Sequence, residues 1–552
     1  MKFRISLGKG FFPLLFSSLL MILCLVGCAE DSNILNNGKS RQLEFSVTTH
    51  NWSDSANSNK SSDQKIPSRA TPISTFDTSK NFNVIADENK SGIWSTEVNN
   101  ETASYSSTNN IWQITATHYW PGTGSTVNFY FYYPTSISGS ITHNTGSAPV
   151  LSYTVPYNAA DQIDILASSK TGVAGDSYSQ TPVDFKHIFA AVQFSVGTAG
   201  LPEGTISSIT INGIKNSGTY TFGNGWTLNS GMTTFKVSPS TAINGTSGEG
   251  ITSGAYTLMM IPQTFNNATI TLTYNTGTAY TKTISGTWDA GNTYTYNLSK
   301  PVNIGDYYYS DGTWGTIMEH NNSTAVPIGV IFSNSTSNID KGHGWTHGYA
   351  MALQNAGSAT STYQWYTSES GNPTGTYIAG VDNIMSDKDG YTHSGYLQTL
   401  GYAAGIAARG YTAKDKNGNT VTDPSCSSGW YLPSCGQWYD ICVNLGGMAT
   451  VSGKFYTNSG TNWLRWYSGD DGSVTNYSSL CESAINVYLN ILLTKGYSVD
   501  LFSNDYEVYW SSSEYNSSWV YSIYFLVSDN VTLGYNGSGK TSSANVRPVA
   551  AF

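Results

Sequence analysis

Charged side chains are scarce in this sequence. Asp, Glu, Lys and Arg together supply 11% of the 552 residues, whereas about 25% is usual for soluble domains. Solubility must therefore come from Ser, Thr, Asn and Gly. Acidic residues outnumber basic ones by 36 to 26, which gives a formal net charge of −10 at pH 7. A chain this acidic lacks the basic surface that binds phosphate backbones, which excludes nucleic acid as a partner.

Cysteine is absent from residues 29–425. Because no disulfide can form there, that part of the chain must be held together by sheet packing alone. The later cysteines are Cys426, Cys435, Cys442 and Cys481, and none has a CxxC or Cys/His spacing. We therefore expect structural cysteines, no metal and no cofactor. Their pairing stays open, except that Cys435 and Cys442 lie about 10 Å apart on one predicted helix, too far for a disulfide.

Helical periodicity is almost absent before residue 400. Short segments that alternate apolar and polar residues recur instead, separated by clusters of Gly, Asn, Ser and Thr. Clear examples are residues 128–134, 270–274 and 294–298, and residues 43–47 form an earlier one between two polar linkers. This pattern favours β-sandwiches, so the chain is predicted to be mainly β.

The N-terminus has the organisation of a secretory signal peptide. Three basic residues precede an apolar run over residues 11–26, as signal peptides require. Residues 25–28 (LVGC) resemble the lipobox of bacterial lipoproteins. The resemblance implies removal of residues 1–27, acylation of Cys28, and a lipoprotein of the outer membrane or cell surface. Residues 28–70 would then be a lipid-anchored linker and first strand. The alternative is an ordinary signal peptide in which Cys28 is incidental.

Seven short segments follow one another in a characteristic order: residues 82–86, 119–121, 129–134, 162–167, 185–192, 258–263 and 288–294. Their order and spacing resemble those of the fimbrillin-like proteins of Bacteroidota. The resemblance implies two transthyretin-like β-sandwiches, at residues 71–175 and 176–302. It also implies export as a lipoprotein and assembly with other pilus subunits.

Residues 303–552 form a different region, in which two amphipathic helices are predicted. Ser434 and Gln437 form a capping box in front of the first helix, and Ser479 and Glu482 form one in front of the second. Such boxes satisfy the free amides of a first helical turn. Glycines follow the last apolar residue of each helix, which ends both.

Three motifs in this region have a fixed order: residues 429–433 (GWYLP), 509–515 (YWSSSEY) and 546–549 (VRPV). They resemble a widespread bacterial family with a C-type-lectin-like fold, which implies an α+β C-terminal domain. The residue triplets through which sugar-binding lectins hold calcium are absent from the sequence. Calcium-dependent sugar binding is therefore not implied.

One aromatic cluster lies in a polar stretch between the two predicted helices. It comprises Trp463, Trp466 and Tyr467, with Asp470 and Asp471 close behind. Aromatic faces suit both sugar rings and protein partners, and carboxylates would bond sugar hydroxyls. We predict a surface loop that binds ligand. The alternative is that one or two of these aromatics cover the core.

Other polar residues are assigned structural roles. His343 and His347 have the spacing of an HExxH metalloprotease motif, but the Glu is missing, so turn or core positions are favoured. Three Asp-rich segments lack complete EF-hand spacing and are predicted turns. Glu514 and Arg547, both inside motifs, are predicted to form an ion pair.

These features predict a surface lipoprotein of a pilus system that acts as a tip or accessory adhesin. Its C-terminal domain would bind a glycan or a host or bacterial surface protein. In this pilus class a terminal strand completes a neighbour's sheet, so a subunit extended by about 250 residues would decorate or end a filament. The alternative is a surface lipoprotein that binds such ligands without a pilus. An enzyme is a remote alternative, because no acid–base pair has a convincing setting.

Overall fold

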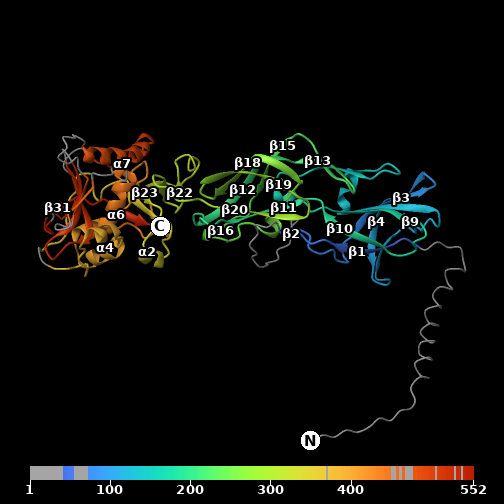
Figure 1. Ribbon diagram of the computed structural model, residues 1–552, viewed down its shortest axis with the longest axis horizontal. Coiled ribbons are helices and arrows are strands. Elements are labelled where there is room, and N and C mark those ends of the chain that lie inside the picture. Colours follow the sequence, from blue (N-terminus) through green and yellow to red (C-terminus); the bar gives the residue numbers. More distant parts are fainter. Residues whose placement is uncertain are drawn as a thin grey trace, which may run out of the picture.

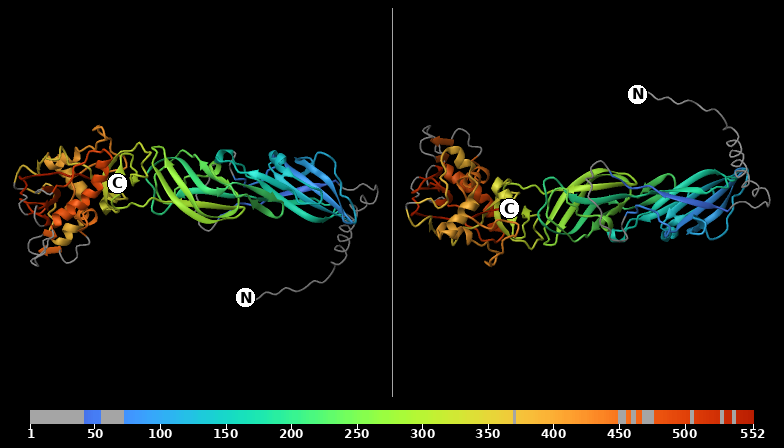
Figure 2. Two further views of the ribbon diagram at one scale, coloured as in Figure 1. Left: turned by 90° about the horizontal axis from the view of Figure 1, so that it is seen from above. Right: turned by 90° about the horizontal axis from the view of Figure 1, so that it is seen from below.

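The computed structural model describes most of the chain. The described residues are 42–54, 72–368, 371–448, 455–458, 463–466, 476–503, 507–526, 530–535 and 539–552. The molecule is elongated: β-sheets occupy one end and the middle, and a mixed α and β unit occupies the other end (Figure 1). Views from above and below keep these three parts in a row (Figure 2). The predicted class, mainly β with an α+β C-terminal part, is confirmed.

A seven-stranded sheet closes on itself at the N-terminal end. Its strand order is β1 (Glu44–Thr49), β10 (Thr181–His187), β9 (Leu166–Ala174), β6 (Ser125–Tyr133), β3 (Phe82–Lys90), β4 (Ile93–Ser106) and β5 (Ile111–Ile114). Phenylalanine rings fill the interior, and Phe45 of β1 lies 5.4 Å from Phe131 in an edge-to-face contact. The strand predicted at residues 43–47 is therefore confirmed as β1. Strand β10 also belongs to this sheet, although the sequence placed the start of the next sandwich at residue 176.

Two further sheets form the middle of the molecule. One has the order β17 (Leu258–Met260), β11 (Ala190–Val196), β20 (Asn292–Leu298) and β2 (Ser53–Asp54). The other runs β15 (Met232–Val237), β12 (Gly204–Lys215), β18 (Gln263–Tyr274) and β19 (Ala279–Trp288), with β16 (Thr241–Ile243) beside β12. Ile209 and Ile211 of β12 share the core face because side chains two apart point the same way, and the register shift between Ile206 and Ser208 brings Ile206 to it as well. All three are 0% exposed.

A small sheet lies between these two parts. It consists of β14 (Gly225–Leu228), β13 (Ser217–Thr221), β8 (Val150–Thr154) and β7 (Ile141–Thr142). Three 3-10 turns, η2 (Thr135–Ser140), η3 (Ala159–Asp161) and η4 (Gly254–Tyr256), connect the strands nearby. One continuous apolar cluster runs from Ile85 to Leu298. The closed seven-stranded sheet and the middle sheets thus pack against each other through one apolar core.

The C-terminal unit is built on two five-stranded sheets. The first is β22 (Trp314–Gly315), β21 (Tyr307–Tyr309), β23 (Pro327–Ser333), β24 (Tyr349–Ala352) and β32 (Val549–Ala551). The second is β26 (Phe455–Asn458), β27 (Trp463–Trp466), β30 (Val531–Gly534), β29 (Val520–Phe525) and β28 (Glu507–Glu514). A short pair, β25 (Tyr363–Gln364) and β31 (Ser543–Ala544), lies beside them. Tyr509 and Asn545 form a parallel bridge that links β28 to the segment leading into β32.

Six α-helices are described in this unit: α2 (Asn338–Gly342), α3 (Val381–Ser386), α4 (Gly390–Thr399), α5 (Ala403–Arg409), α6 (Cys435–Asp440) and α7 (Tyr477–Thr494). The two helices that the sequence predicted are α6, which continues as the π-turn η5 (Ile441–Leu445), and α7. The capping box of Ser434 and Gln437 is confirmed. The second box is wrong, because α7 begins earlier and Asn476 accepts the amide of Ser479 as N-cap. No helix in the described residues is long and apolar enough to cross a membrane.

The middle sheets and the C-terminal unit are joined by specific contacts. Tyr280 of β19 donates its hydroxyl to the carbonyl of Trp314 at 2.6 Å, and the Trp314 indole donates to the carbonyl of Lys300 at 3.2 Å. The Lys300 ammonium lies 2.8 Å from Glu319. Because Trp314 is only 1% exposed, this junction is a packed interface that holds the C-terminal unit at the end of the rod.

Candidate functional site

The N-terminal segment lies along both sheet regions. Strand β1 pairs in parallel with β10, and β2 pairs in parallel with residues Asn292 and Thr293 of β20. Between them, the His187 imidazole lies 2.9 Å from Asp164 and 3.1 Å from the carbonyl of His50. Trp52 stacks on the same imidazole with ring centroids 4.0 Å apart. The segment is therefore fixed at the seam between the two parts by one buried histidine.

The predicted aromatic site is only partly described. Trp463 and Trp466 lie in strand β27 between β26 and β30, so the expected loop is wrong for these residues. Trp466 is 2% exposed and stacks on Tyr439, with ring centroids 5.9 Å apart. Trp463 is half-buried on the other face, where the Arg465 guanidinium lies 4.5 Å from its ring. Trp466 therefore belongs to the core, which was the alternative to a ligand-binding role for the aromatics of this cluster.

The remaining predicted site residues, Tyr467, Asp470 and Asp471, lie outside the described residues. Cys28 and the signal peptide also lie outside them. Ligand binding by the aromatic segment stays a prediction, and its most exposed described member is Trp463.

The predicted ion pair between Glu514 and Arg547 is wrong. Glu514 pairs with Lys540, and both side chains are 0% exposed. Arg547 donates instead to the carbonyls of Ala352 at 3.3 Å and Asp500 at 2.6 Å. The bridge between Tyr509 and Asn545 explains the error: in parallel register Arg547 reaches residue 511, about 10 Å short of Glu514.

No pattern in the sequence identifies Lys540 as the partner of Glu514. Its ammonium also donates to the carbonyl of Gly371 at 2.6 Å. This Lys lies beside a short bridge between Trp519 and Gly539, in a stretch with no periodic pattern. Only the pairing of distant segments brings it to Glu514.

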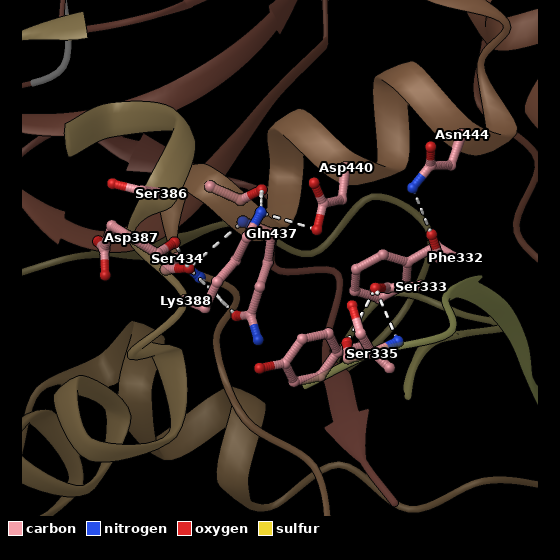
Figure 3. Close-up of polar contacts among 12 residues, drawn as sticks. Phe332, Ser333, Ser335, Ser386, Asp387, Lys388, Ser434, Gln437, Asp440 and Asn444 are labelled. Carbon is pink, nitrogen blue, oxygen red and sulfur yellow. Dashed lines mark hydrogen bonds and ion pairs between the residues drawn. The ribbon is translucent and has the colours of Figure 1, made fainter. Parts of the chain in front are cut away.

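The motif residues around α6 form a polar network that holds the fold together (Figure 3). Ser434 donates to the carbonyl of Asp387 at 2.6 Å, and Ser513 of β28 donates to the Asp387 carboxylate at 2.5 Å. The Lys388 ammonium lies 2.7 Å from Asp440 of α6. Burial raises the pKa of Asp440, and Lys388 offsets part of that shift. Ser434, directly after the GWYLP motif, and Ser513 of the YWSSSEY motif thus meet at Asp387, and the Ser512 amide donates to the Pro433 carbonyl at 2.8 Å.

The cysteines of this region are free thiols. Cys435, Cys442 and Cys481 are each 0% exposed, whereas Cys426 is half-buried. Burial raises the pKa of Cys435 well above its ordinary value, so the thiol stays protonated. None of the pairings left open by the sequence is formed, and a buried protonated thiol is a poor nucleophile.

The histidines and acidic turns take structural positions. His343 is the C-cap of α2, and the ring of His347 lies 4.7 Å from that of Trp314 at the junction. The Asp415 carboxylate accepts the amides of Asn417 and Asn419, both at 2.8 Å, as expected of a turn. Within the described ranges, no group of three or more His, Cys, Asp or Glu residues is arranged to hold a metal ion.

Comparison with known proteins agrees with the fold of the first two parts. Residues 68–305 match the family model described as fimbrillin-like. The order of the motifs predicted this similarity, and the match supports the expectation of a chain that is not an enzyme. No curated protein sequence matches the chain.

Several solved structures are similar to the chain. A fimbrial protein from Bacteroides ovatus has 15% identity and a TM-score of 0.30, over 93% of this chain and 100% of that chain. A fimbrial protein from Bacteroides vulgatus has 16% identity and a TM-score of 0.31, over 40% and 88%. The tip fimbrial protein Mfa3 from Porphyromonas gingivalis, with a C-terminal truncation, has 10% identity and a TM-score of 0.25, over 41% and 90%. These values are too low to carry a role from those proteins to this chain.

Proposed function

We propose that this chain is a surface-anchored pilus protein, a tip or accessory subunit whose C-terminal unit binds a glycan or a surface protein. The fimbrillin-like match over residues 68–305 supports a place at the cell surface among other pilus subunits. The observation that carries the proposal is the packed continuation of the two sheet regions into residues 303–552. A unit of that size at the end of a rod is positioned to meet a target.

The position of β32 supports an end or side location in a filament. Its residues 549–551 pair with β24 and are at most 2% exposed. Val549 and Tyr431 exchange two main-chain hydrogen bonds of 2.9 Å. A strand engaged on both sides is not free to complete a neighbour's sheet, as strand addition requires. A subunit built this way ends or decorates a polymer more readily than it propagates one.

The C-type-lectin-like assignment of residues 303–552 is part of the proposal. Helices α6 and α7, the Trp510 strand β28 and the late strand β32 follow one another in the order that the resemblance implies. The bond from the Ser512 amide to the Pro433 carbonyl gives its first two motifs a shared structural role.

Anchoring through Cys28 is also proposed, on the lipobox resemblance. Mass spectrometry of the N-terminal peptide from membrane fractions should find a lipid-modified Cys28. The Cys28→Ala variant should leave the membrane fraction. A variant that stays membrane-bound would refute the anchor without affecting the adhesin role.

The adhesin role is tested by deleting residues 303–552 in producing cells. We expect the truncated chain to remain in sheared pilus fractions, while attachment to glycan-coated or cell surfaces is lost. Immunogold labelling of the full chain should mark filament ends or sides. Continuous labelling along the shaft, or unchanged attachment after truncation, would contradict the proposal. Full-length chain found only in membranes, with attachment intact, would favour the surface lipoprotein without a pilus.

A further inference from the structure

The C-terminal unit contains a cavity of about 560 Å³ between helix α5 and the loop that follows β24. One wall is a single face of α5, formed by Ala403, Ile406 and Ala407 and continued by Gly410, at the helical spacing of three and four residues. The volume falls within the range of about 300–1,000 Å³ that is usual for small-molecule sites. No described residue of the Trp463 cluster lines it, so it is a separate candidate site.

The opposite wall includes Asn355, whose side chain is buried and held by hydrogen bonds. Asn355 is 4% exposed; its main-chain amide donates to Asp500 at 2.8 Å and its side-chain amide donates to the carbonyl of Ala359 at 3.3 Å. Those two bonds fix the side chain and its Oδ1 is enclosed, so Asn355 gives this wall a fixed shape and offers no open acceptor to a ligand.

A positive charge lies at the edge of the cavity. The Lys414 ammonium donates to the Thr420 hydroxyl at 2.7 Å, and no carboxylate of the described residues lies within ion-pair distance of it. The turn behind Lys414 is held by Asp415, whose carboxylate accepts two main-chain amides. A fixed ammonium with further donor capacity favours an anionic group on the ligand.

The apolar part of the lining suits the carbon face of a ring. Tyr363 and Tyr411 both line the cavity, and the Tyr363 hydroxyl is held by the carbonyl of Ala356 at 3.3 Å. Ile406 on α5 is 47% exposed. A Cβ atom on Gly401 would have no neighbour within 4 Å, so the rim of the cavity is open there. Tyr rings supply rigid contact area at low entropic cost.

We propose that this cavity binds a carboxylate-bearing sugar residue, such as a uronic or sialic acid at the end of a glycan. The carbon face would lie against the Tyr363 and Ile406 side chains, and the carboxylate would meet the Lys414 ammonium. The inference rests on the proposed glycan-binding role of the C-terminal unit and names its site and ligand class.

The test is calorimetric titration of the purified full chain with 3′-sialyllactose, with a glucuronic-acid-terminated disaccharide and with neutral lactose. We expect at least one acidic sugar to bind more tightly than lactose. Lys414→Gln should raise its Kd about tenfold or more, the effect of losing one charge-assisted bond. Lys416→Gln is the matched control, because Lys416 lies over the Tyr497 ring, outside the cavity lining, and should leave Kd unchanged. Ala403→Phe, at an exposed helix position, should fill the cavity and abolish binding.

Each outcome decides the inference. The site is refuted if the Lys414→Gln and Ala403→Phe variants both still bind the acidic sugar and both keep the melting temperature of the original chain. Equal binding of acidic and neutral sugars, insensitive to Lys414→Gln, overturns the ligand class. A full chain that attaches to cells yet binds no acidic sugar overturns this inference alone. Acidic-sugar binding without any cellular attachment supports the site and refutes the adhesin role.

Discussion

Glu514 and Lys540 form an ion pair in which both side chains are fully buried. The second Glu514 oxygen accepts the main-chain amide of Thr374 at 2.9 Å and is also bonded by the Thr374 hydroxyl. The Lys540 ammonium lies 5.5 Å from the centre of the Trp365 ring. This pair ties two loops to the end of β28, and buried charges of this kind are stable only when both partners are present.

Removing one partner of this pair should be severely destabilising. Lys540→Met keeps the volume but leaves a buried carboxylate unpaired, so we expect a loss of about 3–5 kcal/mol in the free energy of unfolding. Urea unfolding followed by near-UV circular dichroism measures it.

The control is Lys80→Met, which breaks the pair with Asp77, whose side chain is 53% exposed, and should cost about 1 kcal/mol or less. The double variant Lys540→Met, Glu514→Gln should recover part of the loss. Equal small losses for both single variants would show that the Glu514 pair is not buried in solution.

Stability should fall as the pH drops below about 6.5. Burial lowers the pKa of both His320 and His347 below their ordinary value. Between the folded and the unfolded pKa of each histidine, the unfolded chain binds more protons than the folded chain. The free energy of unfolding is therefore at its full value above about pH 6.5 and decreases as the pH falls toward the folded pKa. Melting temperatures from pH 8 to 5 measure the decline.

His347→Gln should flatten part of this pH dependence, because it removes one of the two buried imidazoles. His50→Gln is the control, since the side chain of His50 is 54% exposed. An unchanged slope in His347→Gln would contradict the assignment.

The two tryptophans of β27 should respond differently to substitution. Trp466→Ala removes a core side chain and should lower the free energy of unfolding by about 3–5 kcal/mol. Trp463→Ala, at a half-buried position on the opposite face, should cost clearly less. If Trp463→Ala weakens ligand or cell binding without a change in melting temperature, the predicted aromatic site gains support. Equal destabilisation by both would place both rings in the core.

The thiols of the C-terminal unit should react in two classes. In the native chain only Cys426 should be labelled by a thiol reagent, and slowly, because burial raises its pKa. Cys435, Cys442 and Cys481 should react only after unfolding, since all three are fully buried. Mass spectrometry of labelled peptides identifies which cysteines have reacted. Rapid native labelling of Cys435, or a disulfide among the four, would contradict the structure.

Local patterns in the sequence predicted the elements whose formation depends on neighbouring residues. Strand β1 follows from the alternation of residues 43–47, and the start of α6 follows from Ser434 and Gln437, three residues apart. The order of short motifs predicted the similarity of residues 68–305 to the fimbrillin-like family. Helices α4 and α5 were missed, because the Gly- and Ala-rich face of α5 carries no strong apolar periodicity.

Tertiary structure alone decided which distant residues meet. Trp466 is buried because β27 pairs with β30, a strand about 70 residues later in the chain, and nothing near Trp466 encodes that partner. Glu514 meets Lys540 instead of Arg547 because register, not motif membership, fixes cross-strand neighbours. The cavity beside α5 likewise joins Asn355 to Lys414 across 59 residues. The sequence by itself determined β1, the start of α6 and the turn at Asp415, whereas the sites depend on contacts that only the folded chain creates.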